Sequence, residues 1–137
     1  MNWNLILKLS LFGLAMGIAT AFIIPSNIEG IFWLAIFIIS AYFIAKNCTY
    51  MYFANGFCLS LLNCVWIIAA HLIFFEPYMA SHAKEADMYN NNLLHLSPRV
   101  ALTIIGVVIG IVSGLVQGLF AFIASKIVKN RAIPFQD

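Results

Sequence analysis

The chain has 137 residues, of which 64% are hydrophobic and only 9% are charged, whereas an ordinary soluble domain has about 25% charged residues. The formal net charge is +2, and the basic residues form no cluster, so we expect no nucleic-acid partner. Four long apolar segments take up most of the sequence. This composition leaves almost no room for a separate soluble domain and indicates a single membrane domain over residues 1–137.

The four apolar segments cover residues 3–24, 27–46, 54–76 and 98–129. A helix needs about 20 residues to cross a hydrocarbon layer about 30 Å thick, and each segment is long enough. We therefore predict an all-α, polytopic membrane protein. It should be a four-transmembrane-helix bundle with the lipid bilayer as its immediate partner.

The first segment has an alternative interpretation as a cleaved signal peptide. Lys8 precedes an apolar run that ends in small residues at 19–21, a pattern typical of a cleavage site. Apolar residues continue to Ile24, however, and a row of small residues that cleavage would discard runs through the segment. We therefore expect the first helix to be retained.

Charged residues sort to the two sides of the predicted bundle. The side that holds both chain ends is mainly basic, with Lys8, Lys46, Lys126, Lys129 and Arg131 against Asp137. The other side is mainly acidic, with Glu29, Glu76, Glu85 and Asp87 against Lys84 and Arg99. Because basic residues mark the cytoplasmic side, we predict cytoplasmic N and C termini and a place in the bacterial inner membrane.

A short connection joins the first two predicted helices. Pro25 ends the first helix, and Ser26 followed by Glu29 three residues later is typical of a capping box at the start of the second. The two helices should therefore form an antiparallel hairpin. The second helix is almost uniformly bulky over 31–39, so we expect much of its surface to face lipid.

The only sizeable connection is an outer loop over residues 77–97. Residues 81–89 could form a short surface helix, which the asparagines at 90–92 would end. Ser97 followed by Pro98 then predicts the start of the last helix, with serine as the N-cap and proline in the first position. At 1.5 Å per residue this helix is ~45 Å long, so it must tilt or extend beyond the bilayer.

Small residues recur every four positions in the first and last segments. The last carries Gly106, Gly110, Gly114 and Gly118, and the first carries Gly13, Gly17 and Ala21. In lipid this GxxxG or glycine-zipper pattern lets a second helix approach closely, although each glycine costs a soluble helix about 1 kcal/mol. We expect the two rows to pack against each other within one subunit. The alternative is self-association of the last helix in a homo-oligomer.

No Asp, Glu, Lys or Arg lies in the middle of any apolar segment. A charge there costs at least about 2.5 kcal/mol and usually marks an ion or coupling site, so its absence weighs against an ion-driven transporter. The sequence also has no carboxylate pair, phosphate-binding loop or nucleophile motif. We therefore predict a protein that is not an enzyme and that needs no cofactor or metal.

Neutral polar residues fall at matching depths in the third and fourth segments. Ser60 and Asn63 should face Ser113 and Gln117 across a contact between these helices. The simpler interpretation is interhelical hydrogen bonding, worth about 0.6 kcal/mol per bond on average. The alternative is a polar strip that lines a path for water or a solute.

The histidines are weaker candidates for functional residues. His71 lies well inside an apolar segment, where it could be a proton-sensitive or ligand-binding group, or a neutral side chain bonded to a backbone carbonyl or to the loop. Glu76 could reach back to it. The loop also carries His82, Glu85, Asp87 and His95. Zinc sites need three or four convergent ligands, so we expect a solvated polar loop and treat the three scattered cysteines as packing residues.

These observations favour a small non-enzymatic membrane protein, an accessory or assembly subunit or an oligomeric scaffold with a membrane-protein partner. The alternative is a small channel or carrier for an uncharged or hydrophobic solute, which requires a cavity beside Asn63 and Gln117. A membrane enzyme built around His71 and the loop histidines is the least favoured hypothesis, because it needs three metal ligands to converge.

Overall fold

The computed structural model describes residues 1–128, and this part of the chain folds into six α-helices without a strand. The helices are α1 (Trp3–Phe22), α2 (Ser26–Asn47), α3 (Tyr52–Ile73), α4 (Phe75–Ser81), α5 (Ala83–Asn90) and α6 (Pro98–Ile127). The all-helical fold predicted from composition is therefore confirmed. Lys129, Arg131 and Asp137, which the charge pattern uses, lie outside the described residues.

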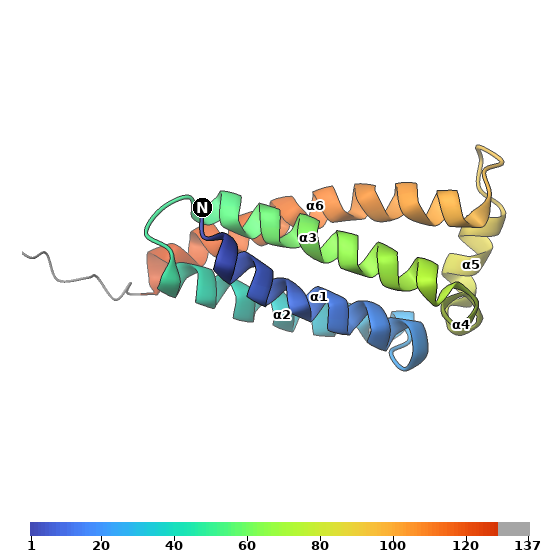
Figure 1. The fold of residues 1–137 in the computed structure, drawn as a ribbon, viewed down its shortest axis with the longest axis horizontal. Helices are drawn as coiled ribbons and strands as arrows, with labels where there is room; N and C mark the ends of the chain where they lie inside the picture. Colours follow the sequence, from blue (N-terminus) through green and yellow to red (C-terminus); the bar gives the residue numbers. More distant parts are fainter. Residues whose placement is uncertain (129–137) are drawn as a thin grey trace, which may run out of the picture.

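Four long helices run side by side in an elongated bundle, and the two short helices α4 and α5 lie across one end of it (Figure 1). We call this end, with the α1–α2 turn and the start of α6, the α5 end. The opposite end, with the N-terminus and the α2–α3 turn, is the N-terminal end. The four long helices have mean hydropathies of 1.9 to 2.3 and are long and apolar enough to cross a membrane.

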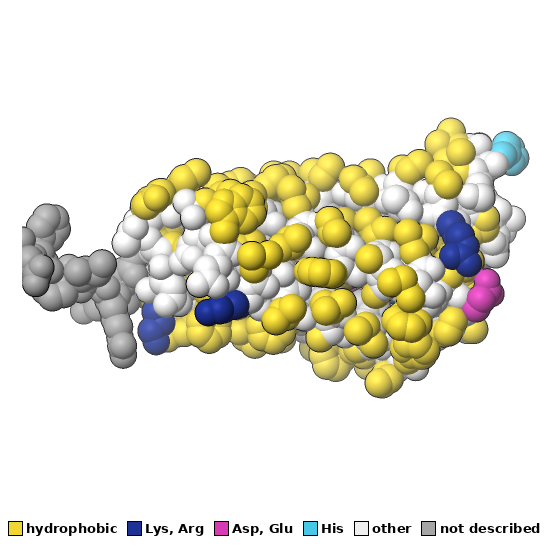
Figure 2. Space-filling view, viewed as in Figure 1, with side chains coloured by type: hydrophobic (Ala, Val, Ile, Leu, Met, Phe, Trp, Pro, Cys, Tyr) yellow, Lys and Arg dark blue, Asp and Glu magenta, His cyan; other side chains and the backbone are white. Residues whose placement is uncertain are grey.

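The surface of the bundle has the pattern of a membrane protein. Apolar side chains cover the middle of the face seen in Figure 2, and charged side chains appear only near the two ends. Many large apolar side chains are exposed, among them Ile31 at 70% and Ile38 at 54% on α2. The expectation that α2 offers much of its surface to lipid fits this exposure.

Helix α3 is the centre of the packing. It packs most extensively on α6 and next on α1, while α2 packs mainly on α6. Helices α1 and α2 follow each other in the chain but contact each other only sparsely. The predicted packing of α1 on α6 is therefore wrong, because α3 occupies the space between them.

The boundary between α1 and α2 differs in one detail from the predicted capping box. Pro25 takes the N-cap position, and Ser26 is already the first helical residue. The Ser26 hydroxyl donates to Glu85 of α5 at 2.9 Å, and the Glu29 carboxylate accepts from the Trp33 indole at 3.0 Å. The capping box is wrong because both side chains bind partners other than the backbone at the helix start.

The predicted outer loop is mostly helical. Helix α3 ends at Ile73, three residues before the predicted end at 76, and α4 follows almost at once. The predicted short surface helix is confirmed as α5. Pro77 falls in the first turn of α4, where its missing N–H group costs nothing. Pro98 begins α6 as predicted, although the Ser97 side chain makes no capping hydrogen bond.

Two apolar clusters hold the bundle together, one near each end. The cluster at the N-terminal end contains Ile6, Leu9, Ile44, Leu59 and Ala121, with Cys48 beside them. The cluster at the α5 end contains Ala21, Tyr78, Tyr89, Ala101 and Leu102. The α5 cluster depends on the short helices, since both of its tyrosines belong to α4 and α5.

Candidate functional site

The glycine row of α1 fits against α3. A methyl group added at Gly13 would lie 2.7 Å from the Cα atom of Asn63, and one added at Gly17 would lie 2.9 Å from the Cβ atom of Ala70. Distances this short leave no room for any side chain. Ala21, the third residue of the row, is fully buried in the cluster at the α5 end.

The glycine row of α6 fits against α3 as well, on another side of it. Each glycine of this row lies against one side chain of α3: Gly106 against Ile68, Gly110 against Cys64, Gly114 against Phe57 and Gly118 against Phe53. A methyl group at any of these positions would approach that side chain to within 2.9 Å. Close approach explains both rows as expected, but the partner of each row is α3.

The predicted polar strip divides between three interfaces. The Ser60 hydroxyl donates to the Ser113 hydroxyl at 3.3 Å, so this part of the predicted contact between α3 and α6 is confirmed. Asn63 lies against Gly13 of α1 instead. The Gln117 amide donates to the backbone oxygen of Phe37 on α2 at 3.4 Å.

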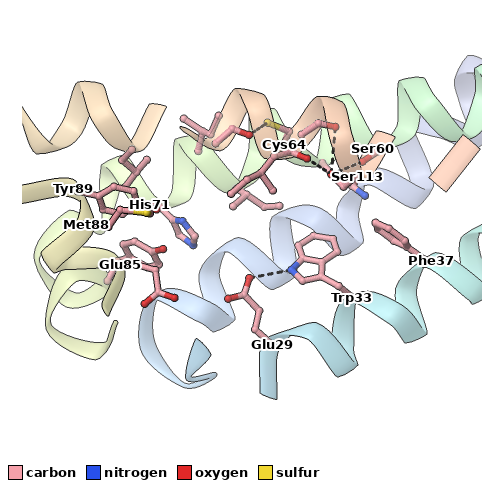
Figure 3. A pocket seen from close by; sticks show the side chains of 18 residues that line it. Glu29, Trp33, Phe37, Ser60, Cys64, His71, Glu85, Met88, Tyr89 and Ser113 are labelled. Atoms are coloured by element: carbon pink, nitrogen blue, oxygen red, sulfur yellow. Dashed lines mark hydrogen bonds between the residues drawn. The ribbon is translucent and has the colours of Figure 1, made fainter. Parts of the chain in front are cut away.

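A cavity of about 520 Å³ lies between α2, α3 and α6, and α4 and α5 close one end of it (Figure 3). Most of its wall is apolar or aromatic: Trp33, Phe37, Ile67, Ile68, Met88, Tyr89, Leu102 and Ile109. Ser60, Asn63 and Ser113 line it, but Gln117 does not. The cavity that the carrier hypothesis requires is therefore present beside Asn63 and lacking beside Gln117.

The cavity ends near the middle of the bundle. The Ser60–Ser113 pair lies at this inner end, well away from His71 (Figure 3). Beyond it, Phe37 of α2 contacts Phe120 of α6 edge to face, with ring centroids 6.1 Å apart. This contact joins α2 to α6 and separates the cavity from the N-terminal end.

Asn63 is the most unusual polar group of the cavity wall. Its side chain is 4% exposed, and its Oδ1 atom has no hydrogen-bond partner. A buried polar atom without a partner costs about 1–3 kcal/mol. This atom faces α1, because a methyl group added at Gly13 would lie 2.6 Å from it, so it is buried in the α1–α3 contact and does not face the cavity.

Two carboxylates stand at the α5 end of the cavity. Glu29 of α2 and Glu85 of α5 are both half-buried, and each accepts one hydrogen bond, from Trp33 and Ser26 respectively. The Ser26–Glu85 bond ties α5 to the start of α2. Figure 3 shows both carboxylates and His71 grouped at this end of the cavity. Sequence reasoning placed Glu29 and Glu85 on the acidic side but gave no sign that they share a cavity.

His71 begins a stack of three rings. Its Nε2 atom lies 2.8 Å from the Thr20 hydroxyl of α1, and its ring stacks on Tyr78 at 3.8 Å. Tyr78 in turn stacks on His82 at 4.5 Å. His71 thus binds a side chain of a long helix, where we expected a backbone carbonyl or the loop, and Glu76 is exposed.

The outer segment is less solvated than predicted. His82 is 1% exposed, and Tyr78 and Tyr89 are 5% and 6% exposed. Burial raises the pKa of Tyr78, and a hydrogen bond to Tyr89 and the charges of Glu29 and Glu85 raise it further. Burial also raises the pKa of Tyr89. Both phenols therefore stay neutral near the two carboxylates.

Residues 1–128 contain no group of three or more His, Cys, Asp or Glu side chains that could hold a metal ion. His95 lies exposed in the loop before α6, with a left-handed backbone. The Cys64 thiol donates to the Gly106 backbone oxygen at 3.2 Å, while Cys48 and Cys58 pack at the N-terminal cluster. All three cysteines fit the packing role expected of them.

Comparison with protein-family models, with curated proteins and with solved structures finds no match to this chain.

Proposed function

We propose that this chain is a small integral membrane protein that binds a predominantly apolar solute in the cavity between α2, α3 and α6, as a carrier or a solute-binding subunit. It would lie in the bacterial inner membrane with the N-terminal end in the cytoplasm. Lys8 and Lys46 near that end, and the acidic residues at the other, support this orientation. The α5 end would then face outward.

The observation that carries this proposal is the cavity itself, with its mostly apolar wall and its few polar groups. Ligand sites of drug-sized molecules are mostly apolar, occupy roughly 300–1,000 Å³ and contain a few placed polar groups. The cavity has this size and this lining. A bundle that serves only to pack would gain stability by filling such a space.

The glycine rows support this choice over an oligomeric scaffold. Both rows are occupied by α3 of the same chain, so neither leaves a seam for a second copy. A membrane-protein partner and a homo-oligomer stay predictions. Glu29 lies in the first turn of α2, and no Asp, Glu, Lys or Arg lies in the middle of a long helix, which still disfavours an ion-coupled mechanism.

Quenching of tryptophan fluorescence tests the proposal, because Trp33 lines the cavity whereas Trp66 bonds Ser10 on the α1 side. A Trp3→Phe/Trp66→Phe variant in nanodiscs retains Trp33 alone. Titration with 8-bromo-octanol, whose bromine quenches indoles on contact, should quench Trp33 saturably. The matched control, Trp3→Phe/Trp33→Phe, retains Trp66, a half-buried side chain outside the cavity wall, and should show only the linear quenching caused by alcohol dissolved in the bilayer.

Linear quenching of both tryptophans would overturn the proposal, because it would mean that the alcohol reaches Trp33 only from the bilayer. Circular dichroism of each variant establishes that the helical content is unchanged, so a folding defect cannot be mistaken for a lack of binding.

A further inference from the structure

We propose that the solute carries an ammonium group, which is held at the α5 end of the cavity between Glu29 and Glu85, while its apolar body extends toward Ser60 and Ser113. This inference rests on the proposed function and names the chemical class of the solute: a lipophilic amine. Four observations support it.

The two carboxylates are fixed in place. The Trp33 indole holds Glu29 at 3.0 Å, and the Ser26 hydroxyl holds Glu85 at 2.9 Å. The bonds use Oε1 of Glu29 and Oε2 of Glu85, so each carboxylate keeps a second oxygen as an acceptor. Both carboxylates line the same cavity as the phenols of Tyr78 and Tyr89.

The described chain supplies no cation to neutralise them. Within residues 1–128, no lysine or arginine forms an ion pair with either carboxylate. Arg99 is engaged elsewhere, donating to the Leu72 backbone oxygen at 3.1 Å and lying 4.2 Å from the centre of the Phe75 ring. Two half-buried like charges at a cavity mouth are stabilised by a bound cation.

Aromatic rings complete the site. Trp33 and Tyr89 line the cavity together with the two glutamates, whereas His71 and His82 cover the two faces of Tyr78. Faces of tryptophan and tyrosine attract ammonium groups, and cages of such rings recognise amine ligands. Carboxylates with aromatic rings favour an organic ammonium ion over a small metal cation, for which no ligand cluster is present in the described residues.

The inner part of the cavity has the length and the lining for the apolar body of the solute. His71 and Ser60 stand eleven positions apart on the α3 wall of the cavity, a length of about 16 Å at 1.5 Å per residue. The wall between these positions, with Ile67 and Ile68, is apolar and suits an alkyl body.

A competition experiment tests the ammonium group. The protein with Trp33 as its single tryptophan, in phosphatidylcholine nanodiscs with 8-bromo-octanol, is titrated with octylammonium, octanol or octanoate. Concentrations are expressed as mole fractions in the bilayer. Octylammonium should restore the fluorescence at about a tenfold lower mole fraction than octanol, the scale of one hydrogen bond to a charged group, and octanoate should be weakest. Equal potency of octylammonium and octanol would overturn the inference.

Variants separate the charge from the cavity. Glu29→Gln/Glu85→Gln retains hydrogen-bonding side chains and should abolish the preference for octylammonium while leaving octanol unchanged. Glu76→Gln, which changes an exposed carboxylate outside the cavity wall, should retain the preference. A preference that persists in the double variant would contradict the role of the two glutamates. If none of the three probes displaces 8-bromo-octanol saturably from the protein with both glutamates intact, the proposed function itself is refuted.

The same assay identifies the source of the amine. Nanodiscs that contain phosphatidylethanolamine offer the ammonium group as a lipid headgroup. If the lipid headgroup occupies the site, it competes with octylammonium, and a higher mole fraction of octylammonium is needed in these nanodiscs than in phosphatidylcholine alone. An unchanged mole fraction would assign the site to a free amine.

Discussion

The two halves of the bundle contain the same apolar residue types, but one half is closely packed and the other encloses a cavity. In the half near the N-terminal end, α3 and α6 approach so closely that a methyl group added at Gly56 would lie 2.6 Å from the Gln117 backbone oxygen. In the half near the α5 end, α2 and α6 enclose a cavity of about 520 Å³. Close packing in one half therefore makes the frame that holds the other half open.

The helices that close the cavity explain why it can persist. Helices α4 and α5 bring two buried tyrosines to the α5 end, where they pack on Ala21 and Leu102. These contacts and the Ser26–Glu85 bond fix the distance between α2 and α6 at that end. The cavity is a consequence of this cap and of the Phe37–Phe120 contact at its floor.

The largest expected effect on stability comes from adding one methyl group to a glycine in each half. Gly56→Ala should lower the free energy of unfolding by about 1–3 kcal/mol, because the methyl group meets backbone atoms that cannot move separately. Gly106→Ala should cost less than about 1 kcal/mol, since it meets only the Cγ1 and Cδ1 atoms of Ile68, a side chain that borders the cavity and can turn into it. Unfolding in denaturing detergent measures both.

Gly30→Ala is the matched control, because nothing lies within 4 Å of a methyl group at that position of α2. It should leave stability unchanged or raise it. Equal losses for Gly56→Ala and Gly106→Ala would show that the two halves are packed to the same density.

Alkaline pH should weaken the α5 end selectively. Burial raises the pKa of Tyr78 above its value of about 10 in the unfolded chain, so the folded state holds this proton more tightly. Its contribution is complete below about pH 10 and is lost as the pH rises toward the folded pKa. At pH 11 the loss should reach about 1.4 kcal/mol, the equivalent of one pKa unit.

Comparison with Tyr78→Phe isolates this contribution, since the variant has no phenol to ionise. The difference in stability between the parent and Tyr78→Phe should be constant from pH 7 to 9 and change above about pH 10. A difference that stays constant up to pH 11 would contradict the buried, neutral state of Tyr78.

The next effect concerns the link between α1 and the ring stack. Thr20→Val should cost about 1 kcal/mol, because it removes the hydroxyl that lies 2.8 Å from Nε2 of His71 and interhelical bonds in membrane proteins are worth about 0.6–1.7 kcal/mol. Thr103→Val is the control, since that hydroxyl donates only to the Arg99 backbone oxygen within α6. The free energy of unfolding of both variants is measured in denaturing detergent. A larger loss for Thr103→Val than for Thr20→Val would exclude a role for the His71–Thr20 contact.

The smallest effect lies at the inner end of the cavity. A double-mutant cycle with Ser60→Ala and Ser113→Ala should give a coupling energy of about 0.6 kcal/mol for their hydrogen bond. Thermal unfolding of the four proteins in one detergent measures it. A coupling energy of zero would mean that the two hydroxyls act independently.

The sequence predicts the frame of the molecule well. The four apolar segments and Pro98 locate the long helices, because length and hydropathy alone decide which segments can cross a bilayer. The spacing of the glycines predicts close approach. The depths of the polar residues predict a polar contact between α3 and α6, which Ser60 makes with Ser113, although its depth matched that of Gln117. Local patterns of this kind do not depend on which helices are neighbours.

The cavity could not be predicted, because it depends on the order of helices around the bundle. Two glycine rows with equal spacing predict a pair, whereas both rows pack on α3, whose own surface is not rich in glycine. Glu29 and Glu85 are far apart in sequence and meet only because α5 folds back over the start of α2. No local pattern in either segment indicates that contact.

The most direct test of the central claim is a crystal structure of the protein grown with 8-bromo-octanol, with bromine located by its anomalous scattering. The account predicts a bromine site inside the cavity, close to Ser60, Asn63 or Ser113 and on the α5 side of Phe37. Bromine found only on lipid-facing surfaces, such as the exposed side of α2 around Ile38, would contradict it.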